Sequence, residues 1–444
     1  MDAIHENTSN KIHTRPLAPS GPVAVVLAGA GARGAYEAAY IATMLPHLQP
    51  RPTIFVGTSA GAINAALLAS VADATPEKAR DEIIMRWGMI TKKRVMEPLW
   101  RSLPRAIFQY ASAVALGTNS PDSLLDTTPL AHSLKDRELV DWDRIRNNIA
   151  SAKVDTLAVV ATEAGSGRTR VFYERASKLT KIDGSARAPQ VALAGSTSKM
   201  QSDADQAIDY VCGQLEAEHV RASAAIPVFF PPVSLPIGSR EAFFLDGGVR
   251  LNAPLKPAIA LGAKGLIVIS TDPRRHGASD AIAGSKSPSM QDQVLEIMRG
   301  VSADRMIEDV RVLLNRNRAV LEARDGVGAD RYIPLIFGGP QDQDRVGSVA
   351  ARAVREILRG PDLVQVLKNL DLWAMDRLTS VSSASGPDIL SYLLFEPEFI
   401  SEALKAGTQD AEALLNDYPD PADLWDSLRS REIRRDSMTG RKAA

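Results

Sequence analysis

Short apolar runs, separated by longer stretches of helical or loop character, form the main pattern of this chain. Such runs are typical of strands that are buried on both faces of a parallel sheet. Strands that alternate with helices in this way predict a doubly wound α/β sheet. The expected strands are 23–27, 53–56, 156–161, 243–245 and 266–270.

Two stretches interrupt this pattern. Residues 86–119 mix tryptophans such as Trp87 with basic residues such as Lys92 and Arg94, which fits either a membrane-facing lid or helices that pack on the sheet edge with solvated basic faces. Residues 185–205 are rich in Ser, Ala, Gly and Asp and predict a mobile loop.

The second half of the chain is expected to be mainly helical. Apolar residues such as Val310 and Leu313 have helical spacing, further helices are expected near 349–358 and 363–378, and 332–337 is the one strand expected there. The expected organisation is therefore a disordered leader at 1–21, an α/β domain at 22–272, a linker loop at 273–289, a helical extension at 290–428 and a basic flexible tail at 429–444.

Composition narrows the partners and the compartment. The chain has 52 Lys and Arg against 53 Asp and Glu, so no overall field favours nucleic acid. Cys212 is the single cysteine, which excludes an internal disulfide, and the first twenty residues contain no apolar signal segment. We expect a cytoplasmic protein whose membrane contact, if any, is peripheral, because no apolar run is long enough to span a bilayer.

A serine bracketed by glycines follows the second expected strand. Gly57-Thr58-Ser59-Ala60-Gly61 lies between the apolar run 54–56 and the small, mostly apolar stretch 62–69. This order predicts a strand, a sharp turn and a helix, with the serine hydroxyl exposed at the turn. The flanking glycines avoid a clash of a Cβ atom with the neighbouring strand and helix. Ser59 is therefore a candidate nucleophile.

A glycine-rich loop, Gly29-Ala30-Gly31-Ala32-Arg33-Gly34, follows the first expected strand. It matches a dinucleotide-binding loop, but the acidic residue that would bind the ribose is missing at the end of the next strand. Backbone N–H groups at a helix N-terminus also stabilise an oxyanion. We favour the oxyanion interpretation over a dinucleotide loop or a purely structural turn.

The serine needs a group that accepts its proton. His276 is the one histidine that could complete a Ser-acid-His order, although Ser59 lies too early in the sheet for that fold. The other candidate is Asp246, in the turn Asp246-Gly247-Gly248 after an apolar strand. An ordinary hairpin turn would look the same. If Asp246 is the base, burial must raise its pKa.

Together, the glycine loop, the elbow and the Asp246 turn resemble the patatin-like phospholipases in order and spacing. Further marks agree: 123–130, the Arg221-Ala222-Ser223-Ala224-Ala225-Ile226-Pro227 segment, and Asn252 and Pro254. The resemblance covers residues 22–272, with weaker echoes in 392–395 and in Asp410-Ala411. It implies a three-layer α/β/α sheet with a mainly helical C-terminal extension.

The resemblance also implies a Ser-Asp dyad that hydrolyses phospholipids or other acyl lipids with no cofactor and no metal. Ser59 would be the nucleophile, Asp246 the base and the backbone of 29–31 the oxyanion hole, with Arg33 packing the loop. Ala30 departs from the family pattern, in which many members have glycine. Alternatives are an acyltransferase that uses the same dyad and a lipid-binding regulatory protein without catalysis.

Overall fold

The computed structural model describes residues 18–98, 108, 112, 122–176, 199–203, 207–271, 304–322, 332–340, 345–358, 391–392 and 394–425. Several predictions concern residues outside these ranges. They are the linker loop 273–289, the helix at 363–378, the basic tail 429–444, most of the leader and His276.

A mixed, ten-stranded sheet forms the centre of the fold. Its parallel part has the order β10-β9-β1-β2-β3. Each of these strands is apolar and buried along its length, as strands covered on both faces must be. Their bounds are Val23–Leu27 for β1, Ile54–Thr58 for β2, Thr156–Glu163 for β3, Gly265–Ile269 for β9 and Leu335–Gly338 for β10.

Beyond β3, strand direction changes. β4 and β8 both pair antiparallel to β3, and β7 and β8 form a hairpin. The strand expected at 243–245 is present, but the prediction that it is parallel was wrong. Its side chains alternate between buried and exposed, which is typical of an antiparallel strand. The prediction of a loop at 185–205 was wrong for residues 199–203, which form β5. The bounds are Thr169–Arg175 for β4, Lys199–Asp203 for β5, Ile208–Cys212 for β6, Val233–Ile237 for β7 and Arg240–Asp246 for β8.

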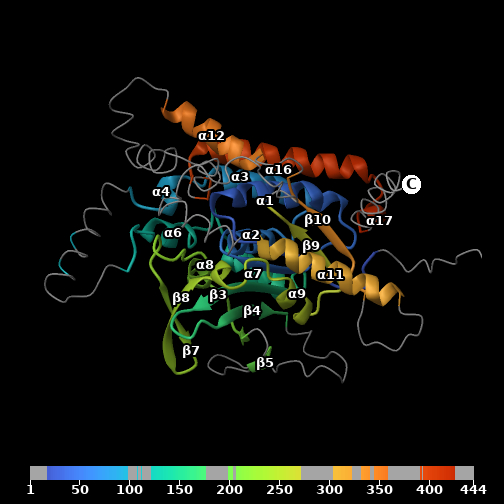
Figure 1. The fold of residues 1–444 in the computed structure, drawn as a ribbon, viewed down its shortest axis with the longest axis horizontal. Helices are drawn as coiled ribbons and strands as arrows, with labels where there is room; N and C mark the ends of the chain where they lie inside the picture. The colour runs from blue at the N-terminus through green and yellow to red at the C-terminus, as the bar shows by residue number, and fades with distance from the viewer. Residues whose placement is uncertain are drawn as a thin grey trace, which may run out of the picture.

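Helices cover both faces of the sheet (Figure 1). Along β1, Val25 and Leu27 belong to one apolar core and Val26 to the other. The first core is closed by α1 (Gly34–Met44), α2 (Ala60–Ser70), α3 (Pro76–Gly88), α7 (Trp142–Ala150), α12 (Arg345–Leu358) and α16 (Pro397–Asp417), and the second by α9 (Leu255–Ala260) and α11 (Asp304–Glu322). The expected three-layer α/β/α arrangement is confirmed.

Local sequence explains where several helices begin. Thr75 caps α3 by accepting a hydrogen bond from the Lys78 N–H, and Pro76 occupies the first helical position. Asp141 caps α7 in the same way, through the Arg144 N–H. α1 and α2 are rich in alanine and buried on all sides, so they pack close to the strands.

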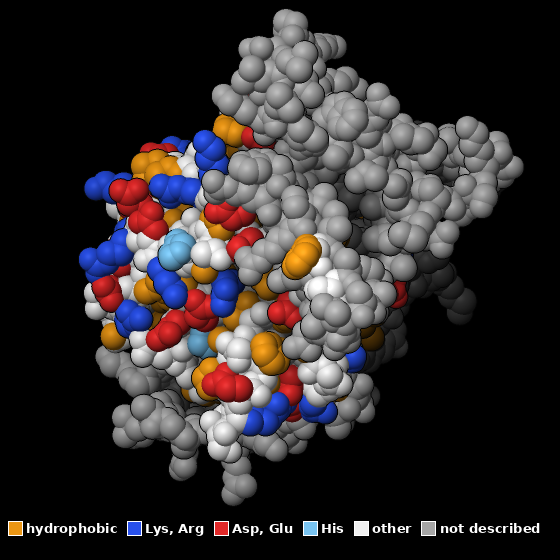
Figure 2. Space-filling view, turned by 90° about the vertical axis from the view of Figure 1, so that its left-hand side faces the viewer, with side chains coloured by type: hydrophobic (Ala, Val, Ile, Leu, Met, Phe, Trp, Pro, Cys, Tyr) orange, Lys and Arg blue, Asp and Glu red, His pale blue; other side chains and the backbone are white. Residues whose placement is uncertain are grey.

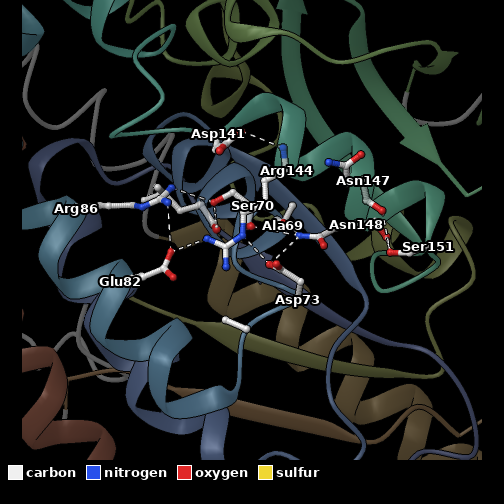
Figure 3. Close-up of polar contacts among 12 residues, drawn as sticks. Ala69, Ser70, Asp73, Glu82, Arg86, Asp141, Arg144, Asn147, Asn148 and Ser151 are labelled. Carbon is white, nitrogen blue, oxygen red and sulfur yellow. Dashed lines mark hydrogen bonds and ion pairs between the residues drawn. The ribbon is translucent and has the colours of Figure 1, made fainter.

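A polar network joins α2, α3 and α7 on the outer side of the first core (Figure 3). Arg144 donates to Asp73 and Glu82, and Arg86 donates to Glu82 and to the Ser70 hydroxyl. Arg86 is buried, so these acceptors offset part of the cost of removing its charge from water. The network fixes the end of α2, the helix that begins beside Ser59.

The C-terminal part of the chain packs on the α/β domain. β10 is the strand expected at 332–337, and it joins the central sheet beside β9, while α16 packs along α1 (Figure 1). A Cβ atom at Gly407 of α16 would lie 2.2 Å from the Tyr36 carbonyl oxygen, so only glycine permits this approach. The Tyr36 hydroxyl also donates to Asp410, which pairs with Arg345. The sheet thus extends past the boundary expected at residue 272.

The first residues of the aromatic and basic stretch pack as part of the fold. Trp87 is fully buried in α3, and Lys92 and Arg94 of α4 (Lys92–Val95) pair with acidic side chains. This part forms packed helices as expected, but they lie on other helices, α3 on α1 and α4 on α6, and not on the sheet edge. Most of 99–121 lies outside the described residues. Within the described part of the chain, no helix is both long and apolar enough to cross a bilayer.

Candidate active site

Ser59 lies between the end of β2 and the first residue of α2, as the sequence predicts. Its backbone has φ 55° and ψ −125°, a conformation that non-glycine residues rarely adopt and that tertiary contacts must hold. A Cβ atom at Gly57 would lie 2.1 Å from the Gly61 carbonyl oxygen, and one at Gly61 would lie 2.3 Å from that of Leu27. The two glycines therefore allow the sharp turn.

The hydroxyl of Ser223 holds the strained turn in place. The Ser59 N–H donates to Ser223 Oγ at 2.8 Å, and Ser223 Oγ donates to the Val160 carbonyl oxygen of β3 at 2.5 Å. Ser223 ends α8 (Ala217–Ser223) and is fully buried. This chain of bonds ties the elbow to the neighbouring strand, so the Ser59 side chain is held at a fixed place.

Asp246 ends β8, and its carboxyl group lies near enough to the Ser59 side chain for the hydroxyl to lower its pKa. Its carboxylate accepts from the Gly248 N–H at 2.7 Å, and its own N–H donates to Ala225. Burial raises the pKa of Asp246 from 3.8 to about 6, although the Ser59 hydroxyl and the bond from Gly248 oppose this shift. Asp246 has the burial that a raised pKa requires, and the structure brings the two candidate catalytic residues together.

The glycine loop lies directly beside the elbow. The Gly29 N–H donates to Asn252 Oδ1 at 3.0 Å, so it is already occupied. Among the described residues, the N–H groups of Ala30 and Gly31 have no acceptor. These two groups, rather than all three of 29–31, are free to bind an oxyanion. The φ of Ala30 is −145°, outside the left-handed region, so this position does not require glycine.

A buried carboxyl group connects the glycine loop with the elbow helix. Glu37, within α1, accepts from the Ala28 N–H at 2.8 Å and from the Asn64 side chain of α2 at 2.7 Å. Asn64 in turn accepts from the Trp87 indole N–H and donates to the Gly34 carbonyl oxygen. Complete burial raises the pKa of Glu37 to about 8. These bonds hold the start of the loop against the helix that carries Ser59.

An apolar cavity opens beside the two turns. Its volume is about 530 Å³ including its opening to solvent, and Ser59 and Gly31 both line it. Most of the other lining side chains are apolar. They include Ile63, Trp87, Leu130, Leu139, Phe230 and Phe395. A cavity with a serine hydroxyl and otherwise mainly apolar walls suits an apolar group bound next to a reactive group.

The surface around α4, α6 (Thr128–Ser133) and α8 carries both signs of charge. Figure 2 shows that basic and acidic side chains are interspersed over the described part of this face. Several of them form ion pairs, for example Arg94 with Asp136 and Lys135 with Glu218. Among the described residues, no group of three His, Cys, Asp or Glu side chains is arranged to hold a metal.

Sequence reasoning gave no role to several residues that shape the site. Ser223 and Asn252 were noted as part of the family resemblance, but their bonds to Ser59 and Gly29 were not foreseen. Glu37 had a usable signal, because it is the one charged residue within α1. The contact of the glycine loop with 391–392 has no signal in the local sequence.

The family comparison agrees with this geometry. The model of the patatin-like phospholipase family matches residues 25–259, which is just over half of the chain. The chain belongs to the patatin-like phospholipase family. In this patatin-like protein, Tyr392 packs on the glycine loop and α16 packs on α1. Both lie outside the matched region.

Comparison with individual proteins adds little. No curated protein matches the chain. Among solved structures, VipD from Legionella pneumophila is similar at 13% identity over 90% of this chain and 68% of VipD. The TM-score is 0.32, which is too low to support an argument about this fold. Family membership therefore supports lipid acyl hydrolase activity in general.

Proposed function

We propose that this patatin-like phospholipase hydrolyses acyl esters of lipids, of the phospholipase A or lysophospholipase type, through Ser59 and Asp246. The observation that carries the proposal is the placement of the strained Ser59 beside the buried Asp246, where burial raises the pKa of Asp246 to about 6. A carboxylate with this pKa is a stronger base than an exposed aspartate and is still ionised at neutral pH.

Acylation follows from this arrangement. Ser59 Oγ attacks the ester carbonyl carbon, and its proton passes to the Asp246 carboxylate. The carbonyl oxygen becomes an oxyanion that accepts hydrogen bonds from the N–H groups of Ala30 and Gly31. When the intermediate collapses, the ester C–O bond breaks and the leaving alcohol takes the proton from Asp246. The acyl group then remains bound to Ser59 as an ester.

Deacylation repeats these steps with water. A water molecule attacks the acyl carbon and gives one proton to Asp246. The second intermediate collapses, the bond to Ser59 Oγ breaks, and Ser59 recovers the proton as the fatty acid leaves. The apolar cavity beside Ser59 supports an acyl chain, rather than a polar head group, as the part of the substrate that is bound next to the serine.

A fluorophosphonate probe tests the nucleophile directly. We expect the wild type to gain one probe adduct on Ser59 by peptide mass spectrometry and to hydrolyse p-nitrophenyl butyrate. Ser59→Ala should lose both, while Ser348→Ala, which changes an exposed serine on α12, should keep both. Full hydrolysis by Ser59→Ala would contradict the proposal. A new ester formed when an acceptor alcohol is added would instead indicate acyl transfer.

A further inference from the structure

A short segment from the far end of the chain contacts the glycine loop. We call residues 391–396 the C-terminal strap, of which 391–392 and 394–396 are described. Arg33 Nε donates to the Ser391 hydroxyl at 2.5 Å, and the Arg33 guanidinium lies 4.4 Å from the centre of the Tyr392 ring. Arg33 and Ser391 are both buried, although they are 358 positions apart in the chain.

The strap also touches the backbone of the loop. A Cβ atom at Gly31 would lie 2.1 Å from the Tyr392 carbonyl oxygen, so the strap backbone lies against the Gly31 Cα atom. Gly31 has φ +55°, which side chains with a Cβ rarely adopt. The strap therefore limits the conformations open to the same peptide group that offers a free N–H to the oxyanion.

The other end of the strap forms part of the cavity. Phe395 is buried and lines the cavity together with Ser59 and Gly31. The next residue is Glu396, whose carboxylate oxygen Oε1 lies 3.9 Å from Lys92 Nζ of α4. Arg94, also on α4, lines the same cavity. The strap is thus bound at one end to the glycine loop and at the other to α4.

The helix that follows the strap is firmly attached. α16 makes its closest packing with α1, which begins at Gly34 where the glycine loop ends. The close approach at Gly407 and the Tyr36–Asp410 hydrogen bond fix this pair of helices. The strap is therefore held in place by the same helix pair that supports the loop.

We propose that the C-terminal strap is part of the active site. Ser391 and Tyr392 act as positioning residues that hold the glycine loop through Arg33, and Phe395 is a wall that sets the length of acyl chain the cavity accepts. This inference rests on the proposed hydrolase function. It assigns a role to residues outside the region that the family model matches.

The specificity part is tested with Phe395→Leu and a matched control, Phe399→Leu. Phe399 is buried on α16 one turn later but does not line the cavity. We expect the ratio of kcat/KM for p-nitrophenyl dodecanoate over p-nitrophenyl butyrate to rise about fivefold in Phe395→Leu, because the smaller side chain deepens the cavity. Phe399→Leu should lower Tm and leave this ratio unchanged.

Two results would overturn the role of Phe395. One is a ratio that falls, or that stays within about twofold of the wild type, in Phe395→Leu. The other is an equal shift in Phe399→Leu, which would show that general loosening of α16 changes the ratio.

The positioning part is tested with Ser391→Ala and the control Ser348→Ala. Loss of the Ser391 hydroxyl removes one contact between Arg33 and the strap, and a small displacement of the loop weakens contacts made in the transition state. We expect kcat to fall roughly tenfold with KM unchanged. The control should keep both parameters. An unchanged kcat in Ser391→Ala, or a change confined to KM, would overturn this part.

The same measurements separate the two proposals. If the wild type hydrolyses no ester and Ser59 is not labelled, the hydrolase function fails and the strap proposal falls with it. If hydrolysis depends on Ser59 while the Phe395 and Ser391 variants behave like the wild type, the strap proposal alone fails.

Discussion

The two backbone turns of the site, the elbow at Ser59 and the glycine loop at Gly31, are held in different ways. The glycines of the elbow face backbone atoms of α2 and β1 within the matched family region. Gly31 instead faces the carbonyl oxygen of Tyr392, from the C-terminal strap. Both residues at the centre of these turns have a positive φ, which is strained for Ser59 and open to Gly31 as a glycine.

Because of this difference, a change at the elbow and a change at the glycine loop should affect stability and activity to different degrees. The contacts of the elbow are those of the central sheet, so a change there acts on the whole fold. The contacts of the glycine loop come partly from a segment near the end of the chain, so the loop can be disturbed while the sheet stays intact. Substitutions that crowd each turn should distinguish the two.

For the comparison of the two turns, the largest effect is expected from Gly31→Ala compared with Gly61→Ala. The added methyl group at Gly31 must displace Tyr392, which should lower kcat roughly 10²-fold with a small loss of Tm. The methyl group at Gly61 meets the Leu27 carbonyl oxygen of β1, so Tm should fall much further. Calorimetry and ester hydrolysis check both. Equal losses of Tm would contradict the distinction.

Glu37 links the two turns, and its smaller effect is on the free energy of unfolding, which it makes dependent on pH. The pKa of Glu37 is about 8 in the folded chain and 4.5 when the side chain is exposed to water. At a pH between these two values, unfolding therefore releases the proton of Glu37. This contribution to the free energy of unfolding is complete below pH 4.5 and is lost as pH rises to 8. Between pH 6 and pH 8 the loss is at most about 1.4 kcal/mol per pH unit.

Chemical denaturation at several pH values, for wild type and Glu37→Gln, measures this contribution. The variant has no proton to release, so its free energy of unfolding should fall less steeply between pH 6 and pH 8. Parallel curves would show that Glu37 does not hold its proton in the folded state.

The smallest effect is expected for Ala30→Gly. The negative φ at Ala30 is open to both residues, so the N–H should keep its direction and kcat should change little. Greater freedom of the unfolded chain should lower the free energy of unfolding by about 0.5–1 kcal/mol. A much higher turnover number in the variant would show that Ala30 restrains the loop.

Local patterns in the sequence predicted the parts of the site that are encoded locally. The elbow needs a strand, two glycines and a helix within a few residues, and these lie together at 54–70. The glycine loop and the Asp246 turn are equally compact. The direction of β8 could not be predicted in this way, because a run of three apolar residues does not reveal that Phe243 is exposed.

Contacts between segments that are far apart in the chain could not be predicted from the sequence. The strand at 332–337 was predicted, but its place beside β9 depends on the packing of the whole sheet. The bond from Arg33 to Ser391 joins positions that share no motif. Glu37 is visible in the sequence as an acidic residue among small and apolar ones, but only the packing of α2 against α1 shows that it is buried and bonded to Asn64.

The most direct test of the central claim is the pH dependence of kcat/KM for a short acyl ester. Asp246 must be ionised to accept the proton, and burial raises its pKa to about 6. The account predicts that kcat/KM is level at neutral pH and falls tenfold per pH unit below about 6, and that Asp246→Asn lowers it by roughly 10³-fold. A limb near 3.8, or an Asp246→Asn variant as active as the wild type, would contradict it.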